Sequence, residues 1–186
     1  MRYVLTVAVM LGVGGCTASP QVQVGSGSSP LAAAEKLIDA FYSFDPVSLR
    51  AALSDAPASE AQIIYYQGWA EGGNYVLLNR KPCRIDTVDE VRCDITVKDD
   101  LITALGTGYH VTDTFHLTFS NAKIVKVRTS SNDPPQMEEG FKWLRRQRPD
   151  IWVGPCRGFY AGGRTPQDCV RAVVRGFAEF TARQSR

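Results

Sequence analysis

The segment over residues 107–129 constrains the fold of this chain more than any other part of the sequence. Between residues 109 and 119, bulky apolar side chains alternate with histidines and threonines, and this period of two is typical of a half-buried β-strand. Asn121-Ala122 predicts a tight turn, after which residues 124–129 return as a second strand. Asp113 interrupts the apolar row, so we expect its carboxylate to be paired, hydrogen-bonded or open to a cavity.

The register of this hairpin predicts a partner for Asp113. A two-residue turn places Phe115 opposite Arg128, so that Asp113 and Arg128 share a face as diagonal neighbours. A guanidinium can span that distance, and we therefore predict a buried ion pair between Asp113 and Arg128. The alternative is a catalytic Asp113, which would act as a general base with Tyr66 or Tyr109 as an oxyanion donor. We favour the ion pair, because a lone buried carboxylate beside a guanidinium should ionise and pair rather than act as a base.

The first sixteen residues predict export and lipidation. Arg2 precedes an apolar run over residues 3–13, which is too short to span a bilayer. Val13-Gly14-Gly15-Cys16 resembles a bacterial lipobox, in which the cysteine is lipidated; an ordinary signal peptide that contains a cysteine is the alternative. We expect residues 1–15 to be a lipoprotein signal peptide and residues 16–30, which are polar and rich in Gly and Ser, to be a lipid-anchored flexible tether. The expected location is the bacterial cell envelope, facing the periplasm or the cell exterior.

Four further cysteines predict two disulfides. An even number of cysteines in an exported chain is typical of a disulfide framework, and four cysteines allow three pairings. We predict the pairing of sequence neighbours, because the first pair flanks a hairpin centred near Val88. The predicted bonds are Cys83–Cys93 and Cys156–Cys169. A zinc site of the CxxC type is not expected, because the sequence has no such cluster.

Charge and histidine spacing narrow the partners further. The formal net charge of +2 is too small to predict nucleic-acid binding, and no aromatic-basic recognition motif accompanies it. His110 and His116 are the only histidines, and on one strand they lie about 20 Å apart, too far to share a metal. We therefore expect no metal and no cofactor. Val125 and Val127 are expected on the same polar face, so either the C-terminal segment or a second subunit, in a homodimer through the sheet, should cover it.

The order of the remaining elements predicts an α+β fold. Apolar residues at helical spacing predict three helices before residue 71, and the second of them begins at Pro46 after the N-cap Asp45. Strands are expected over residues 75–78, 83–85 and 91–97, whereas residues 101–105 fit either a strand or a helical turn. Helices are predicted again over 135–147 and from Pro166 onward. Helices followed by antiparallel strands indicate one α+β domain.

This order resembles the nuclear transport factor two-like superfamily, which includes ketosteroid isomerase and SnoaL-like cyclases. AAAEKLIDAFYSFDPVSLRAALS resembles the first two helices of that family, YYQGWAEGG the third helix, and TFHLTFSNAKIVKV the closing hairpin. The resemblance covers roughly residues 31–130. It implies a cone-like domain over residues 31–186, with a curved antiparallel sheet against N-terminal helices and a disulfide-stapled helical extension from about residue 135.

The resemblance also implies a mostly apolar pocket, which the family uses for binding or for catalysis. We predict a membrane-anchored envelope lipoprotein that acts as a non-enzymatic module and binds a small apolar ligand or an envelope protein. The alternative is a SnoaL-like or isomerase-like enzyme that uses Asp113. A ligand is expected to contact Tyr66, Trp69, Tyr109, Asp113, Phe115 and Arg128.

Overall fold

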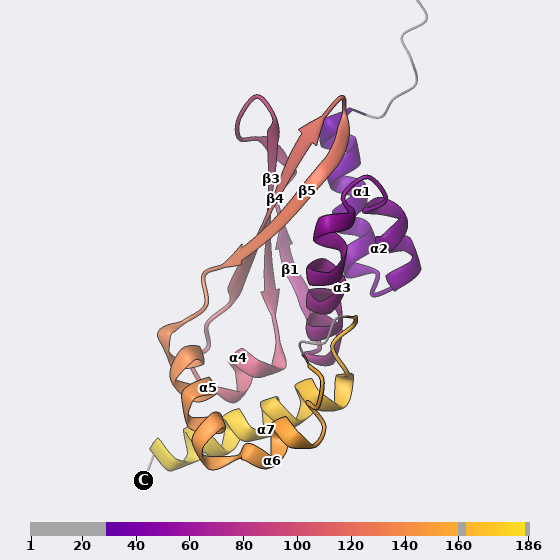
Figure 1. Cartoon of the computed structure of the whole chain (residues 1–186). Helices are drawn as coiled ribbons and strands as arrows, with labels where there is room; N and C mark the ends of the chain where they lie inside the picture. The colour runs from indigo at the N-terminus through magenta and orange to yellow at the C-terminus, as the bar shows by residue number, and fades with distance from the viewer. Residues whose placement is uncertain (1–28, 160–162, 185–186) are drawn as a thin grey trace, which may run out of the picture.

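A computed structural model describes residues 29–159 and 163–184 (Figure 1). Its helices are α1 (Pro30–Tyr42), α2 (Pro46–Ala52), α3 (Pro57–Gly72), α4 (Asp100–Ala104), α5 (Pro135–Gln147), α6 (Pro149–Val153) and α7 (Gln167–Gln184). Its strands are β1 (Val76–Arg80), β2 (Arg84–Ile85), β3 (Glu90–Lys98), β4 (Val111–Ser120) and β5 (Lys123–Ser131). The predicted α+β order is confirmed, and the ambiguous segment near residue 101 is helical. The predicted lipidation site, Cys16, lies outside the described residues.

The first helices begin where short polar side chains cap them. Ser29 accepts a hydrogen bond from the backbone N–H of Ala32, and Asp45 accepts two from the start of α2. A proline follows each cap at the first helical position, where its missing N–H costs no helical hydrogen bond. Further along, buried Gln67 of α3 donates to two backbone carbonyls near the end of α1. This side chain therefore fixes α3 against α1.

The strands form one antiparallel sheet in the order β1-β3-β4-β5, and β2 pairs with β3 on the side of β1. Burial alternates along β3, so that Val91, Cys93, Ile95 and Val97 face inward. Helices α1, α2 and α3 lie along one side of the sheet in Figure 1. The core forms there, where Phe41 of α1 meets Phe115 of β4 edge to face, with ring centroids 4.9 Å apart.

The β4–β5 hairpin begins as predicted. Asn121 and Ala122 both have positive φ angles, of 50° and 61°, as the two-residue turns of hairpins require. Phe119 pairs with Ile124 across this turn. The ladder then shifts between Thr118 and Phe119, which is a β-bulge that adds one residue to β5.

The bulge makes the predicted Asp113–Arg128 ion pair wrong. Phe115 pairs with Thr129, and Arg128 pairs with His116, one residue away from the expected register. Because side chains alternate along a strand, this single step moves Arg128 to the face opposite Asp113. The same step turns Val127 into the core, where it is 2% exposed, although we expected it on the polar face.

Both predicted disulfides are confirmed. Cys83–Cys93 joins the segment before β2 to β3, and Cys156–Cys169 joins the loop after α6 to the start of α7. The bonded residues are 10 and 13 positions apart in the two cases. Closing loops of this length in the unfolded chain stabilises the fold by about 3 kcal/mol each in the chain-entropy model.

The C-terminal helices form a second packing layer. In Figure 1, α5, α6 and α7 lie together with α4 at one end of the sheet. Gly176 allows α7 to approach α5, because a Cβ at this position would lie 2.2 Å from the Leu144 side chain. Thr165, just before α7, donates its hydroxyl proton to the backbone oxygen of Tyr65 in α3, at 2.8 Å. These contacts hold the C-terminal layer against α3, and a pocket forms where the two meet.

Candidate binding pocket

The pocket has a volume of about 360 Å³ and lies between α3, the end of β5 and the C-terminal layer. Seven of its lining residues are aromatic, and an eighth large apolar side chain is a methionine. The lining comprises Tyr65, Tyr66, Trp69, Tyr75, Ser131, Asp133, Met137, Phe141, Arg145, Trp152 and Phe159. Tyr65, Tyr66 and Trp69 occupy consecutive turns of α3, so one helix supplies one wall.

The aromatic walls support one another. Phe159 stands at the centre, with ring centroids 5.0 Å from Tyr65, 5.8 Å from Trp69 and 6.3 Å from Trp152. Phe141 of α5 lies 6.0 Å from Trp69 and packs edge to face on Phe177 of α7. Aromatic pairs at these separations attract one another beyond their simple burial. The walls are therefore preorganised, which lowers the cost of ordering them around a ligand.

Polar groups of the lining lie at the rim of the pocket and at one buried indole N–H. Asp133 and Arg145 are exposed at the rim, and Asp133 accepts a hydrogen bond from the Ser131 hydroxyl. The indole N–H of Trp152 is buried and has no hydrogen-bond partner among the described residues. Buried donors are normally satisfied, so an unpaired indole N–H in a pocket wall is a group that a polar ligand atom could satisfy.

Asp113 lies beneath this pocket, and it is not one of the lining residues. Its side chain is fully buried and accepts hydrogen bonds from Tyr66 at 2.5 Å and from Tyr42 at 3.1 Å. Burial raises the pKa of Asp113 from 3.8 to about 6, although the two hydrogen bonds oppose this shift. Tyr66 therefore connects the pocket to Asp113, because Tyr66 lines the pocket and its hydroxyl donates to the buried carboxylate.

Asp99 is a second buried acid, which the sequence analysis missed. It caps α4 by accepting a hydrogen bond from the N–H of Ile102 at 2.8 Å, and its side chain is buried. Burial is the main cause that raises the pKa of Asp99 to about 6. Burial is also the largest cause that raises the pKa of the Tyr75 hydroxyl. The negative charges of Asp113, Asp99 and Asp133 raise this pKa further. The base of the pocket at Tyr75 is thus surrounded by carboxylates.

The six residues expected to contact a ligand do not gather at one place. Tyr66 and Trp69 line the pocket, and Phe115 and Asp113 lie in the core behind Tyr66. Tyr109 lines a different hollow, where its hydroxyl donates to the backbone oxygen of Asn132 at 2.9 Å. Arg128 lies on the outer face of the sheet.

The aromatic residues of the C-terminal layer complete the pocket, and sequence reasoning missed them. Phe141, Trp152 and Phe159 belong to the segment that we expected to form a disulfide-stapled helical extension from about residue 135. Their density over fewer than twenty residues was the signal that could have identified them. An aromatic-rich segment outside the expected core needs a surface to pack on, and α3 provides it.

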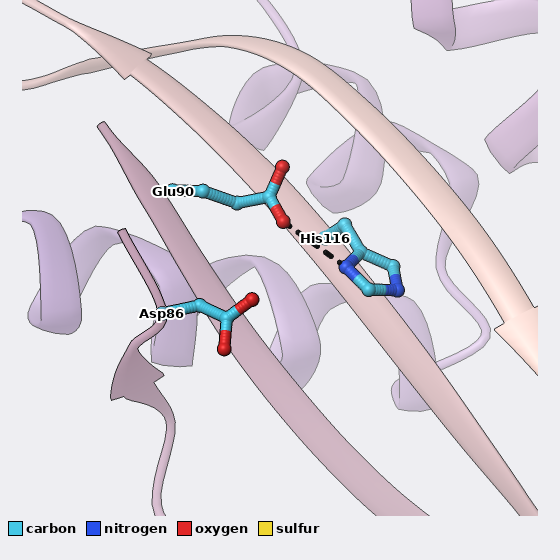
Figure 2. Close-up of side chains that lie close together, drawn as sticks. All are labelled: Asp86, Glu90 and His116. Carbon is cyan, nitrogen blue, oxygen red and sulfur yellow. Dashed lines mark hydrogen bonds and ion pairs between the residues drawn. The ribbon is translucent and has the colours of Figure 1, made fainter. Parts of the chain in front are cut away.

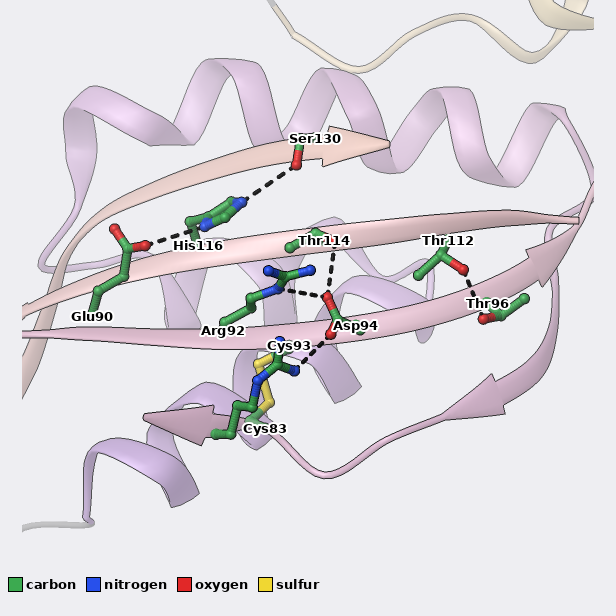
Figure 3. A network of polar contacts seen from close by, with 11 residues as sticks. Cys83, Glu90, Arg92, Cys93, Asp94, Thr96, Thr112, Thr114, His116 and Ser130 are labelled. Atoms are coloured by element: carbon green, nitrogen blue, oxygen red, sulfur yellow. Dashed lines mark hydrogen bonds and ion pairs between the residues drawn. A yellow bond between two sulfur atoms is a disulfide. The ribbon is translucent and has the colours of Figure 1, made fainter. Parts of the chain in front are cut away.

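The outer face of the sheet carries a polar network (Figure 3). Asp94 is partly buried, yet hydrogen bonds from Arg84, Arg92 and Thr114 lower its pKa to about 2. Beside it, the Thr96 and Thr112 hydroxyls meet at 2.9 Å, and His116 lies between Glu90 and Ser130. His110, which we expected on the same strand as His116, is exposed just before β4 begins.

Comparison of the chain with protein-family models, with curated proteins and with solved structures finds no match. Within residues 29–159 and 163–184, no helix has the length and apolar character needed to cross a membrane.

Proposed function

We propose that this protein binds a small, flat, largely apolar molecule in the aromatic pocket. The observation that carries the proposal is a concave site of about 360 Å³ whose lining includes seven aromatic side chains and only a few polar groups. Small-molecule sites in proteins have this composition, and a volume of about 300–1,000 Å³ is typical of them. The density of aromatic rings in the lining favours a ligand with a planar ring system, which can stack on them.

Binding fits the site better than catalysis by Asp113. A general base must reach the proton that it removes, directly or through one water. The Asp113 oxygens accept hydrogen bonds from Tyr42 and Tyr66, and Asp113 is absent from the pocket lining. The carboxylate therefore supports the wall that Tyr66 forms. An isomerase-like reaction would need Tyr66 to move before Asp113 met a substrate.

We further propose that the protein works in a bacterial cell envelope as a lipid-anchored member of the nuclear transport factor two-like superfamily. Two disulfides support an oxidising compartment outside the cytoplasm. The lipobox-like sequence ending at Cys16 supports the anchor. Three N-terminal helices on one side of an antiparallel sheet support the family and its cone-like domain. The aromatic pocket would then hold an apolar molecule that the envelope contains.

Neighbouring serines of β5 provide a matched test of the pocket. Ser131 lines the pocket, whereas Ser130 points to the outer face, where its hydroxyl lies 3.3 Å from His116. Ser131→Trp should fill the rim and weaken binding of an anilinonaphthalene sulfonate dye about tenfold, a change of about 1.4 kcal/mol. Ser130→Trp adds the same side chain outside the pocket and should leave dye binding unchanged.

Dye fluorescence titration of the two variants and the wild type gives the result directly. Native mass spectrometry of protein purified from an envelope fraction adds a search for a bound small molecule. Equal dye affinity in the two tryptophan variants would contradict the proposal, because the dye would then bind elsewhere. If Asp113→Asn instead kept dye affinity but abolished turnover of a ligand found in this way, the enzyme alternative would replace it.

A further inference from the structure

Three side chains that commonly bind metals converge on the outer face of the sheet (Figure 2), and none of them lines the aromatic pocket. Asp86 and Glu90 flank the turn between β2 and β3, and the N–H of Asp86 donates to the backbone oxygen of Glu90 at 2.9 Å. His116 reaches the same place from β4, where it pairs with Arg92, two residues beyond Glu90. One ligand atom from each of the three lies within 4.8 Å of the other two.

We propose that Asp86, Glu90 and His116 bind a divalent transition-metal ion of the zinc type. One imidazole and two carboxylates form a donor set that suits this ion and leave a fourth position open. Bonds of about 2.1 Å to a tetrahedral ion place its ligand atoms about 3.4 Å apart. Asp86 is exposed, so its side chain can rotate inward over the remaining distance.

The contacts of His116 are compatible with this role. Its Nδ1 faces Glu90 Oε1 at 3.2 Å, and its Nε2 faces the Ser130 hydroxyl at 3.3 Å. When Nε2 donates its proton to Ser130, Nδ1 presents a lone pair to a carboxylate oxygen. Two acceptors that face each other are stabilised by a cation between them. A hydrogen-bonded second ring nitrogen is also how metal-binding histidines are usually oriented.

The neighbouring arginines leave this position accessible. Arg84 and Arg92 both bind Asp94, at 2.6 and 2.9 Å, so their charges are matched there. Arg128 binds Glu90 Oε2 at 2.9 Å and leaves Oε1 for the ion. The Arg128 side chain is 53% exposed, and an exposed ion pair of this kind is weak. Arg128 therefore competes with the ion for the charge of Glu90 without blocking it.

The local backbone is held in place before an ion arrives. The Cys83–Cys93 disulfide lies next to the β2–β3 turn and fixes β2 against β3 (Figure 3). A site on paired strands needs little ordering to bind its ion. The spacing of the two histidines in the sequence does not reveal this site, because its other two side chains are carboxylates that the β2–β3 turn brings beside His116.

The second histidine of the chain provides the matched control. His110 is exposed before β4, outside the cluster. The experiment is isothermal titration of Zn²⁺ into full-length protein without an affinity tag, after removal of bound metal by a chelator. We expect one site, a loss of affinity of about tenfold or more in His116→Gln and in Glu90→Gln, and no change in His110→Gln.

Arg128→Ala is a variant in which we expect the Zn²⁺ affinity to rise and not to fall. Removing the competitor of the ion should raise Zn²⁺ affinity severalfold, and circular dichroism checks that each variant is folded. Imidazole NMR signals of His116 should shift with added Zn²⁺, whereas those of His110 should not. Wild-type protein that binds no Zn²⁺, equal affinity in His116→Gln and wild type, or an unchanged or lower affinity in Arg128→Ala would overturn the proposal.

Discussion

At the scale of single residues, Asp113 shows how a carboxylate can occupy an apolar core without a cation. Its charge is stabilised by the hydroxyls of Tyr42 and Tyr66, and its pKa is nevertheless raised to about 6. The desolvation of the carboxylate is therefore larger than the gain from the two hydrogen bonds. The residue orients the pocket wall at the cost of some stability near neutral pH.

That cost has a definite pH dependence. The folded pKa of Asp113, about 6, exceeds its ordinary value of 3.8, so the folded state holds the proton more tightly than the unfolded chain. Below about pH 3 the carboxyl group is protonated in both the folded and the unfolded state, so its ionisation does not destabilise the fold. The destabilisation develops between about pH 3 and pH 6 and is complete above that range. The difference corresponds to about 3 kcal/mol.

Asp113→Asn removes the ionising group and keeps an oxygen that can accept from the tyrosines. We expect the variant to be more stable than wild type by about 2 kcal/mol near pH 8 and equal to it near pH 3. Urea unfolding at the two pH values measures this. Asp99 titrates in the same range and stays as an internal reference, so the variant should retain part of the pH dependence. Lower stability near pH 8 would mean that the core needs the negative charge.

Arg128 gives the complementary test of the register. On the outer face it forms an exposed pair with Glu90, so Arg128→Ala should lower the free energy of unfolding by less than about 1 kcal/mol. If Arg128 were the partner of a buried carboxylate, its removal would lower the free energy of unfolding by about 3–5 kcal/mol. Urea unfolding without added metal distinguishes the two values. A decrease as large as that for a buried pair would support the Asp113–Arg128 ion pair and contradict the observed register.

At the scale of elements, the pocket depends on how the C-terminal layer is attached. Phe159 follows Cys156 by three residues, and the disulfide to Cys169 ties this loop to α7. The ring of Phe159 contacts walls on both sides of the pocket. The disulfide therefore preorganises a binding wall in addition to stabilising the fold.

Replacing Cys156 and Cys169 together by alanine should reduce both stability and binding. We expect a loss of about 3 kcal/mol in urea unfolding and weaker dye binding to the protein that remains folded. The matched control replaces Cys83 and Cys93, which close a loop of similar length and do not line the pocket. That control should lose stability and keep dye affinity. Equal dye affinity in the two double variants would show that the Cys156–Cys169 disulfide does not contribute to binding in the pocket.

At the scale of the whole molecule, the proposed anchor places the aromatic pocket near a membrane. The proposed tether between Cys16 and α1 would keep the domain close to the bilayer. Apolar envelope molecules would then be present at high local concentration. The proposed cation site is on the other face of the sheet, so the two sites could act independently.

Cys16→Ser tests the anchor in a bacterial host. Wild-type protein should incorporate labelled fatty acid and fractionate with membranes, whereas the variant should do neither, because the thiol is the group that is lipidated. Immunoblotting of the fractions and labelling of the purified protein provide the readout. Wild-type protein that carries no label and remains in the soluble periplasmic fraction would contradict lipidation.

The sequence by itself determined the features that close over short distances. The cap at Asp45, the turn at Asn121-Ala122 and the alternation along β3 follow from interactions within a few residues. The disulfide pairing was also predictable, because each pair spans a short loop. Local periodicity and spacing carry this information, so the α+β class followed from them.

Only the tertiary structure decided the register beyond the turn and the composition of both sites. The bulge beside Thr118 depends on how β5 packs, since the N–H of Val127 there donates to Ser59 of α3 at 2.9 Å. The pocket joins α3 to residues some seventy to ninety positions later, and the cation cluster joins a turn to the middle of β4. No local pattern encodes such contacts, because they form only when separate elements pack together, and a one-residue shift changes which side chains meet.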